Sequence, residues 1–406
     1  MGKDFFDAVI VGGGHNGLVC SYYLAKAGLK VKILERRNIV GGAAVTEEFH
    51  PGFKNSTASY TVSLLNPDVI KDMHLKENGL EIIKRPISNF LPVNDKDYIK
   101  VGGSLEETQK EFRKFSNHDA NVLPEYYRRI ENVADVLRDL TTKTPLNLKG
   151  GYLNIAKTVF DLVPIARKTN ELQEDLFNLF TKSAKDFLDS WFESDHIKAC
   201  FGFDSIVGNY ASPETPGSAY VLLHHAMGDV DGNVGSWGFA RGGMGSVAAA
   251  LSSSFQSLGG EIRTNSEVNQ IVVDGKTAKG VQLVSGEIIR ANAVVSNLDA
   301  KRTFLKLIDE KKLPSELSEK ARNFKIRGSS GKVNIALDGM PIFSALPKKS
   351  PLTLGHMHFS DTLERLERAY DDWKDDRWSA DPYVDMVIPT QYHPTMTPPG
   401  KHMMSV

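Results

Sequence analysis

Apolar positions at the start of the chain predict a strand, a helix and a second strand. A short apolar run, DAVIV at residues 7–11, ends in three glycines. Apolar side chains then recur at helical spacing over residues 18–25, until the pair Ala27-Gly28 ends the helix. Residues 31–34, VKIL, alternate as a second strand. Together these elements form a β–α–β unit of about 30 residues.

The middle of the chain follows a helical pattern. Leucine and aromatic side chains keep to steps of three and four over residues 123–140, and again over residues 172–191. Such stripes pack in a protein core more often than they line a ligand site. We therefore expect both stretches to be helices that face the core.

From residue 238 onward the pattern predicts a glycine-rich helix and then strands. The helix lies in GFARGGMGSVAAALSSSFQSLGG and ends at its last two glycines. The strands expected after it, joined by hairpin turns, span residues 261–263, 268–273, 280–284 and 287–290, with a further buried strand at 293–296. One more strand is predicted at 332–337, and another begins at His402.

Charge and composition narrow the class of protein. At 406 residues, the chain is long enough for two or three domains. Its 49 basic and 50 acidic side chains leave a net charge of −1, which disfavours a nucleic-acid partner. No apolar run approaches the roughly 18 residues of a membrane span, and the first residues lead into a strand without a leader pattern. We therefore expect a soluble, cytoplasmic protein.

The glycines after the first strand carry the clearest chemistry. Gly12, Gly14 and Gly17 form G-x-G-x-x-G between a strand and a helix, which is the context that this motif requires. The first glycine makes the tight turn, the second lets a pyrophosphate approach the backbone, and the third lets the helix pack against the strand. The expected cofactor-binding residues of this loop are Gly12, Gly13, Gly14, His15, Asn16 and Gly17.

Glu35 ends the second strand, about 20 residues after the glycines, where a carboxylate accepts hydrogen bonds from ribose hydroxyls. Its charge would repel a 2′-phosphate, so this position favours FAD or NAD over NADP.

A second glycine pair, Gly41-Gly42, follows within RRNIVGG, and a plain NAD site does not need it. The stretch resembles the FAD fingerprint of the flavoprotein superfamily that includes amine oxidases and phytoene desaturases. The resemblance implies that Gly41 and Gly42 lie near the flavin diphosphate and that Arg36 lies by the adenosine.

Further motifs narrow this likeness. GGAAVTEEFHPGFKNSTASYTVSLLNP, FTKSAKDFLDSWFESD, GSWGFARGGMGSVAAAL and KVNIALDGMP together resemble the carotenoid/retinoid oxidoreductase family, which is phytoene desaturase-like. Within it the likeness is greatest to a group named after pyridine nucleotide-disulfide oxidoreductases. In such proteins the strand after the glycine-rich helix places its backbone on the adenine, a role that here falls to Val268 in SEVNQIVV.

The resemblance implies an α/β fold: a Rossmann-like FAD-binding domain, three-layered with a mostly parallel sheet, and an inserted α+β substrate domain. We expect a discontinuous FAD-binding domain at 1–80 and 236–302. The substrate domain would take up residues 81–235 and 303–406. For eukaryotic relatives the resemblance also implies the mitochondrial matrix.

Three features depart from the family pattern. Ala43 and Ala44 stand where many relatives have an arginine, although both remain expected cofactor neighbours. Residues 56–59, STAS, replace a D-T-G-P-like stretch that faces the flavin. The glycine-rich segment that closes over the flavin is missing after residue 300, so the chain resembles a relative without its last quarter to third.

Other chemistries have little support. Cys20 and Cys200 form no redox pair, and no second strand-coupled G-x-G-x-x-G exists, which together disfavour disulfide reduction. We predict no metal site: His356 and His358 alternate but have no supporting carboxylate beside them in the sequence. We name no catalytic residue, because the flavin itself accepts the hydride.

The sequence therefore predicts a FAD-dependent oxidoreductase of the dehydrogenase or desaturase type, taking hydride from an apolar or amine-like small molecule. The alternative is a non-catalytic flavin-binding regulatory protein that acts through a protein partner. A plain NAD dehydrogenase is disfavoured by Gly41-Gly42. The proline-punctuated loop at 341–351 leaves a peripheral membrane contact open.

Overall fold

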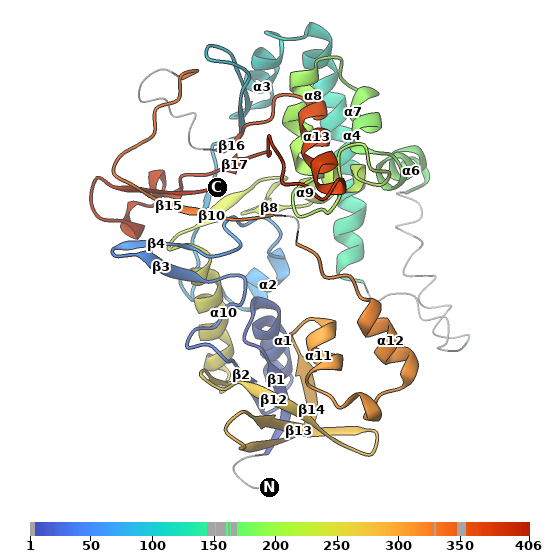
Figure 1. Ribbon diagram of the computed structural model, residues 1–406, viewed down its shortest axis with the longest axis vertical. Coiled ribbons are helices and arrows are strands. Elements are labelled where there is room, and N and C mark those ends of the chain that lie inside the picture. Colours follow the sequence, from blue (N-terminus) through green and yellow to red (C-terminus); the bar gives the residue numbers. More distant parts are fainter. Residues whose placement is uncertain are drawn as a thin grey trace. The chain divides into compact units, whose positions relative to one another are not determined.

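The computed structural model describes residues 5–143, 151, 160, 163, 169–328, 330–346 and 355–406 (Figure 1). The chain forms two compact units. Unit 1 comprises residues 1–83, 239–327 and 393–399, and unit 2 comprises residues 84–238, 328–392 and 400–406. Two short strands, β5 (Ile82–Lys84) and β10 (Gly238–Ala240), lie where the chain passes from one unit to the other.

Unit 1 is built on a six-stranded sheet with the order β11-β2-β1-β14-β13-β12. The pairs β11–β2, β2–β1 and β1–β14 are parallel, and the last two pairs are antiparallel. The strands are β1 (Phe5–Val11), β2 (Val31–Leu34), β11 (Glu261–Arg263), β12 (Val268–Asp274), β13 (Thr277–Leu283) and β14 (Ile288–Ser296). This mixed, mostly parallel sheet confirms the predicted α/β fold class.

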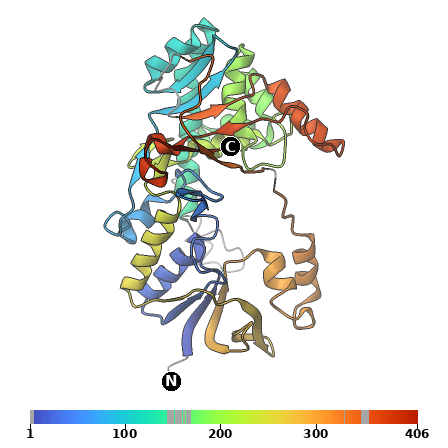
Figure 2. The ribbon, with the colours of Figure 1, turned by 60° about the vertical axis from the view of Figure 1, so that its left-hand side comes forward.

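Two helices, α1 (His15–Lys26) and α10 (Gly245–Ser257), lie side by side against this sheet (Figures 1 and 2). They share one core, in which Leu18 of α1 and Leu251 of α10 are fully buried against Ile33 of β2. The small residues predicted for the second helix explain the close packing, because Ala248 and Ala250 take up little room between the helices and the strands.

Strand β14 corrects the sequence prediction at one point. Residues 287–290 and 293–296 were expected as two strands, but they form the single strand β14. Its first half pairs with β13 and its second half pairs with β1, so one strand serves both the antiparallel and the parallel part of the sheet. Ala293 is exposed rather than buried, because the strand leaves the core before it reaches Val294.

Residues 303–327 fall in unit 1, although the sequence placed a boundary at 302. They carry most of α11 (Ala300–Leu305), the 3₁₀ turn Glu310–Lys312 and α12 (Ser315–Asn323). The Ile271 N–H donates to the Leu307 carbonyl (2.7 Å), and the Lys312 ammonium donates to the Val273 carbonyl (2.7 Å). These bonds to β12 fasten the segment to the sheet. The remaining elements of unit 1 are β3 (Thr46–His50), β4 (Phe53–Ser56), α2 (Pro67–Asp72) and the 3₁₀ turn Pro394–Met396.

Unit 2 combines a second sheet with helices. The sheet has the order β17-β16-β6-β7, with strands β6 (Ile87–Pro92), β7 (Tyr98–Gly102), β16 (His356–His358) and β17 (Asp385–Met386). The helices are α3 (Leu105–Phe112), α4 (Asn117–Thr141), α6 (Gln173–Thr181), α7 (Ala184–Asp189), α8 (Asp195–Gly202), α9 (Ala219–Ala226) and α13 (Leu363–Lys374). The 3₁₀ turns Phe203–Ser205 and Pro389–Gln391 and the short strands β8 (Asp229–Val230), β9 (Asn233–Val234), β15 (Asn334–Leu337) and β18 (His402–Ser405) complete it.

The core of these helices is aromatic. Tyr126 of α4 lies 4.9 Å from Phe192 and 5.1 Å from Phe201, measured between ring centroids, and all three side chains are buried. Helix α4 contains Pro124, which cannot donate a hydrogen bond to the Ala120 carbonyl. The Gln109 side chain of α3 donates to that carbonyl instead (2.7 Å).

The second predicted helical stretch, 172–191, is not one helix. It breaks at Lys182, where Ser183 begins α7 by accepting a hydrogen bond from the Asp186 N–H. Phe177 was expected in the core, but 66% of its surface is exposed. A hydroxyl cap inside an apolar pattern ends a helix and turns the following face, which the period alone does not reveal.

The strand predicted at His402 is confirmed as β18, which pairs with β15. The proline loop is described only as far as residue 346, so residues 347–351 lie outside the described residues. Within the described part of the chain, no helix is both long and apolar enough to cross a bilayer.

Candidate functional site

The first glycines after β1 are required by the local geometry. Gly12 has φ +95°, a conformation that side chains rarely adopt, and its N–H donates to the Leu34 carbonyl of β2 (2.8 Å). A Cβ on Gly17 would lie 2.7 Å from the Gly12 carbonyl oxygen. The tight turn and the close helix thus both depend on glycine, as the motif predicts.

Helix α1 begins without a side-chain cap. Gly14 is its N-cap residue and makes no side-chain hydrogen bond, no acidic residue lies in the first turn, and His15 and Asn16 are exposed. The first N–H groups of a helix have no partner within the helix, and they carry its positive partial charge. This end of α1 can therefore accept an anion such as a phosphate.

The second glycine pair lies directly against the first. The Gly41 N–H donates to the Gly13 carbonyl (2.7 Å), and Gly14 and Gly41 form a parallel bridge. A Cβ on Gly42 would lie 3.1 Å from the Gly14 Cα, and its φ of +61° also favours glycine. Two segments without side chains thus approach each other at the start of α1.

The two alanines after this pair lie differently. Ala43 is exposed, next to the exposed Gly42, whereas Ala44 is buried and packs in the core beside α10. The Ala44 N–H donates to the Gly41 carbonyl (2.9 Å), so this residue holds the glycine pair in its turn.

Glu35 connects the end of β2 to the glycine loop. Its carboxylate, only 8% exposed, accepts hydrogen bonds from the Gly13 N–H (2.8 Å) and the Arg37 N–H (2.9 Å). The neighbouring Arg36 is exposed, while Arg37 pairs with Glu47. The carboxylate thus stands beside the turn where a ribose is expected, and Arg36 extends from the same loop.

Val268 lies close to this loop through its neighbours. The Asn265 N–H donates to the Arg37 carbonyl (2.9 Å) and the Ser266 N–H donates to the Glu35 carbonyl (2.8 Å). Val268 itself begins β12 and is buried in the same core as Leu34. The structure therefore brings together the glycine loop, the second pair, Glu35 and the Val268 segment in unit 1.

Asn297 is a neighbour of this site that the sequence reasoning missed. Its N–H continues β14 by donating to the Val11 carbonyl (2.9 Å), and its side-chain amide donates to the Gly12 carbonyl (3.4 Å). A Cβ on Gly14 would lie 2.7 Å from the same amide nitrogen. A polar residue directly after a strand that pairs in parallel with β1 is the pattern that points to this position, since ligands bind at that edge of such sheets.

The later glycines at 242–245 serve another purpose. The Gly245 N–H donates to the Thr46 hydroxyl (2.9 Å) and the Met244 N–H donates to the Ser56 hydroxyl (3.0 Å). These hydroxyls from β3 and β4 already bind the first N–H groups of α10. A second phosphate site at this helix is therefore disfavoured, in agreement with the wrong glycine spacing noted in the sequence.

Burial raises the pKa of the Cys200 thiol, and it also raises the pKa of the Cys20 thiol. Both cysteines are free. A raised pKa leaves little thiolate at neutral pH, so neither residue has the character of a redox-active cysteine.

Comparison with known proteins identifies the family. Residues 17–398 match the family model described as flavin containing amine oxidoreductase. A Mus musculus protein, pyridine nucleotide-disulfide oxidoreductase domain-containing protein 2, is 34% identical over 426 aligned residues, which cover 100% of this chain and 73% of that protein. The chain belongs to the flavin-containing amine oxidoreductase family.

Other members and their fold agree. A limonene dehydrogenase polypeptide of Castellaniella defragrans is 28% identical, covering 76% of this chain and 54% of that protein. The neurosporene-forming phytoene desaturase of Cereibacter sphaeroides is 24% identical, covering 74% and 54%. A crystal structure of an oxidoreductase from Methanosarcina mazei has the same fold, with a TM-score of 0.60 at 17% identity, covering 98% of this chain and 78% of that one.

This family member is a FAD-dependent oxidoreductase, which confirms the predicted cofactor, enzyme class and phytoene desaturase-like resemblance. The geometry at the start of α1 fits the group, because glycine backbone, an uncapped helix end and a buried carboxylate are what the diphosphate and ribose of FAD require.

We predict that Glu35→Gln lowers the affinity of the chain for ADP roughly tenfold or more, because an amide NH₂ would then face one of the two backbone N–H groups. The wild-type chain should also bind ADP more tightly than ADP carrying a 2′-phosphate, and this preference should shrink in the variant. Isothermal titration with both nucleotides measures these effects. Glu48→Gln, an exposed carboxylate on β3, is the control; equal losses in both variants would contradict the role of Glu35.

Asn297→Ala is expected to weaken ADP binding about fivefold, since it removes the side-chain hydrogen bond that holds the Gly12 carbonyl. Asn292→Ala changes the same residue type on the exposed part of the same strand and should leave the affinity unchanged. The titration used for Glu35 compares them. An unchanged affinity in Asn297→Ala would remove this residue from the site.

Proposed function

We propose that this FAD-dependent oxidoreductase dehydrogenates an apolar or amine-like small molecule, forming a C=C or C=N bond. The observation that carries the proposal is the approach of the two glycine segments at the start of α1, where the Gly41 N–H meets the Gly13 carbonyl. That arrangement suits a dinucleotide whose diphosphate lies on backbone N–H groups.

The residues proposed to hold the cofactor divide by its parts. The backbone of the glycine loop and of Gly42-Ala43 would hold the diphosphate, and Glu35 would accept hydrogen bonds from the adenosine ribose. Arg36 and the Val268 segment would lie along the adenine. Asn297 would keep the first turn in the shape that the diphosphate requires, because it holds the Gly12 carbonyl.

The substrate class rests on relatives and on the sequence likeness. Two relatives are named for the dehydrogenation of hydrocarbons, limonene and phytoene. The family model is named for amines. Hydrocarbon and amine substrates share the loss of a hydride from a carbon atom, so one chemistry covers both. We assign the cofactor to unit 1 and the substrate to unit 2, whose helices carry the aromatic core.

FAD supplies the two-electron oxidant when it is bound, taking the hydride that leaves the substrate carbon. The second hydrogen leaves as a proton, so the substrate loses two hydrogens and gains one double bond. The residues of this chain bind and orient the nucleotide: the uncapped end of α1 offsets the charge of the diphosphate, and Glu35 fixes the ribose. No side chain of the described residues needs to act as a base for a hydride acceptor to work.

The proposal predicts that an apolar or amine substrate reduces the bound flavin without oxygen. The FAD-loaded chain would be mixed anaerobically with limonene, with a long polyene in detergent micelles, and with putrescine, and the loss of the oxidised-flavin absorbance band would be followed. We expect bleaching by at least one of them, at a rate that rises with substrate concentration. Lactate, a polar hydroxy acid, is the control compound.

The pattern of reduction decides between the outcomes. Reduction by a hydrocarbon supports C=C formation, and reduction by the amine supports C=N formation. Reduction by the hydroxy acid alone, or by none of the compounds while dithionite still reduces the flavin, would contradict the proposed substrate class.

A further inference from the structure

Unit 2 brings three metal-ligating side chains together on two short strands. His356 and His358 are alternate residues of β16, so their side chains share one face of the strand. Asp385 of β17 pairs directly opposite His358 in the antiparallel ladder. The carboxylate that His356 and His358 lack in the sequence is thus supplied by the neighbouring strand, 27 positions later, which local spacing does not reveal.

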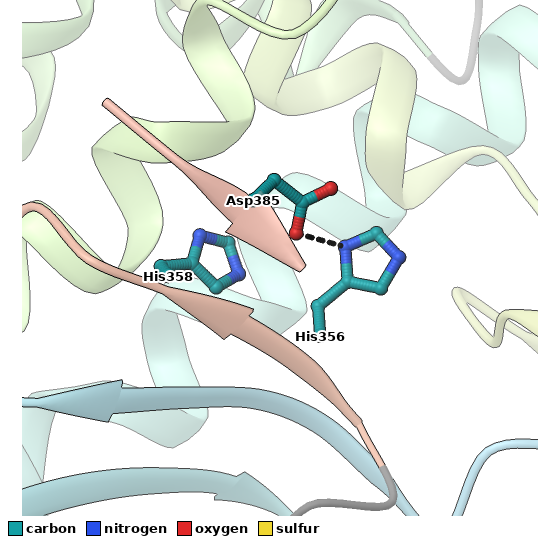
Figure 3. Close-up of side chains that lie close together, drawn as sticks. All are labelled: His356, His358 and Asp385. Atoms are coloured by element: carbon teal, nitrogen blue, oxygen red, sulfur yellow. Dashed lines mark ion pairs between the residues drawn. The ribbon is translucent and has the colours of Figure 1, made fainter. Parts of the chain in front are cut away.

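The three groups are close and buried (Figure 3). The His356 Nδ1 lies 3.2 Å from an Asp385 carboxylate oxygen, and one ligand atom from each residue lies within 4.8 Å of the other two. His356 is 9% exposed and His358 is 1% exposed. Ligands at about 2.0–2.1 Å from a tetrahedral zinc lie about 3.4 Å apart, so the side chains need to draw in slightly around an ion.

His358 is the most informative of the three. Neither of its ring nitrogens makes a hydrogen bond within the described residues, although both are buried. One face of its surroundings is apolar, since its ring centroid lies 3.8 Å from that of Phe203, edge to face. A buried imidazole without a hydrogen-bond partner is costly, and a metal ion on one nitrogen would satisfy it.

The protonation states suit a ligand. Burial lowers the pKa of His358 to about 3, against the opposing charge of Asp385, and burial also lowers the pKa of His356, with Arg85 adding to the effect. Both rings are therefore neutral at pH 7, which is the form that binds metal. Arg85 is a nearby positive charge that opposes a cation, and the carboxylates of Asp385 and Asp204 lie in the same surroundings to offset it.

We propose that His356, His358 and Asp385 bind a divalent transition-metal ion, with Zn²⁺ the ion best matched to two imidazoles and one carboxylate. Three protein ligands leave a fourth position of a tetrahedral site open to water or to a small ligand. The ion would also tie β17 to β16, which otherwise share only a two-residue ladder. Hard ions such as Mg²⁺ prefer oxygen ligands and are expected to bind more weakly.

A second cluster shows what a structural group looks like. His118, Asp119 and Glu193 also lie within 4.8 Å of one another. The Asp119 carboxylate, however, already accepts hydrogen bonds from the N–H groups of Glu193 and Ser194 (both 2.9 Å), and Glu193 accepts one from the Ser116 hydroxyl. The His118 side chain is also 54% exposed. These oxygens are occupied in joining α4 to the loop before α8, so this cluster serves as the control.

The test uses the full, untagged chain after treatment with a chelator. Zn²⁺ would be titrated by calorimetry and its stoichiometry measured by elemental analysis, and Co²⁺ would be added as a spectroscopic probe. We expect one Zn²⁺ per chain, the intense visible bands of four-coordinate Co²⁺, and a higher melting temperature with Zn²⁺. Less than half an equivalent of Zn²⁺, or the weak bands of six-coordinate Co²⁺, would overturn the proposal.

Matched variants locate the ion. His358→Phe keeps an aromatic ring of similar volume and Asp385→Asn keeps the shape of the carboxylate, so folding can be preserved and checked by circular dichroism. Each should weaken Zn²⁺ binding by more than the roughly 10–100-fold that loss of an outer-shell partner costs. His118→Ala in the control cluster should leave the affinity unchanged. Full Zn²⁺ binding by His358→Phe, or its loss in His118→Ala instead, would overturn the assignment.

Discussion

The hydrogen bond from the Gly41 N–H to the Gly13 carbonyl joins two glycine segments that lie before and after β2 in the sequence, and the cofactor side of the protein depends on it. Each segment has positive φ angles, at Gly12 in one and at Gly41 and Gly42 in the other, that most side chains would oppose. Their approach leaves backbone alone at the start of α1. The sheet, Glu35 and Asn297 fix the positions of these segments.

Much of this arrangement could be predicted from the sequence because its causes are local. Strand, glycine turn and helix follow one another within the first residues, and Glu35 ends the next strand as the motif requires. Asn297 could not be found in the same way, because its contact with Gly12 joins residues far apart in the sequence through the pairing of β1 and β14. The single strand β14 was divided in the prediction for a related reason: its two halves have different neighbours.

Unit 2 shows the limit of periodicity more clearly. The helical spacing of 172–191 was correct, but the cap at Ser183 divides the stretch and leaves Phe177 exposed. The histidines of β16 were noticed in the sequence, whereas their carboxylate partner on β17 arises from strand pairing. Polar groups inside an apolar core are costly unless they have partners, which is why this cluster draws attention where the aromatic contacts around Tyr126 do not. Those rings fill the core by ordinary packing.

The central claim is that the two glycine segments together hold the cofactor diphosphate. Backbone hydrogen exchange, followed by mass spectrometry on the chain with and without FAD, tests it most directly. The account predicts that FAD slows exchange in residues 12–17 and 41–44 together, with a smaller effect at 265–268. Slowing confined to one of the two glycine segments, or found only elsewhere in the chain, would contradict it.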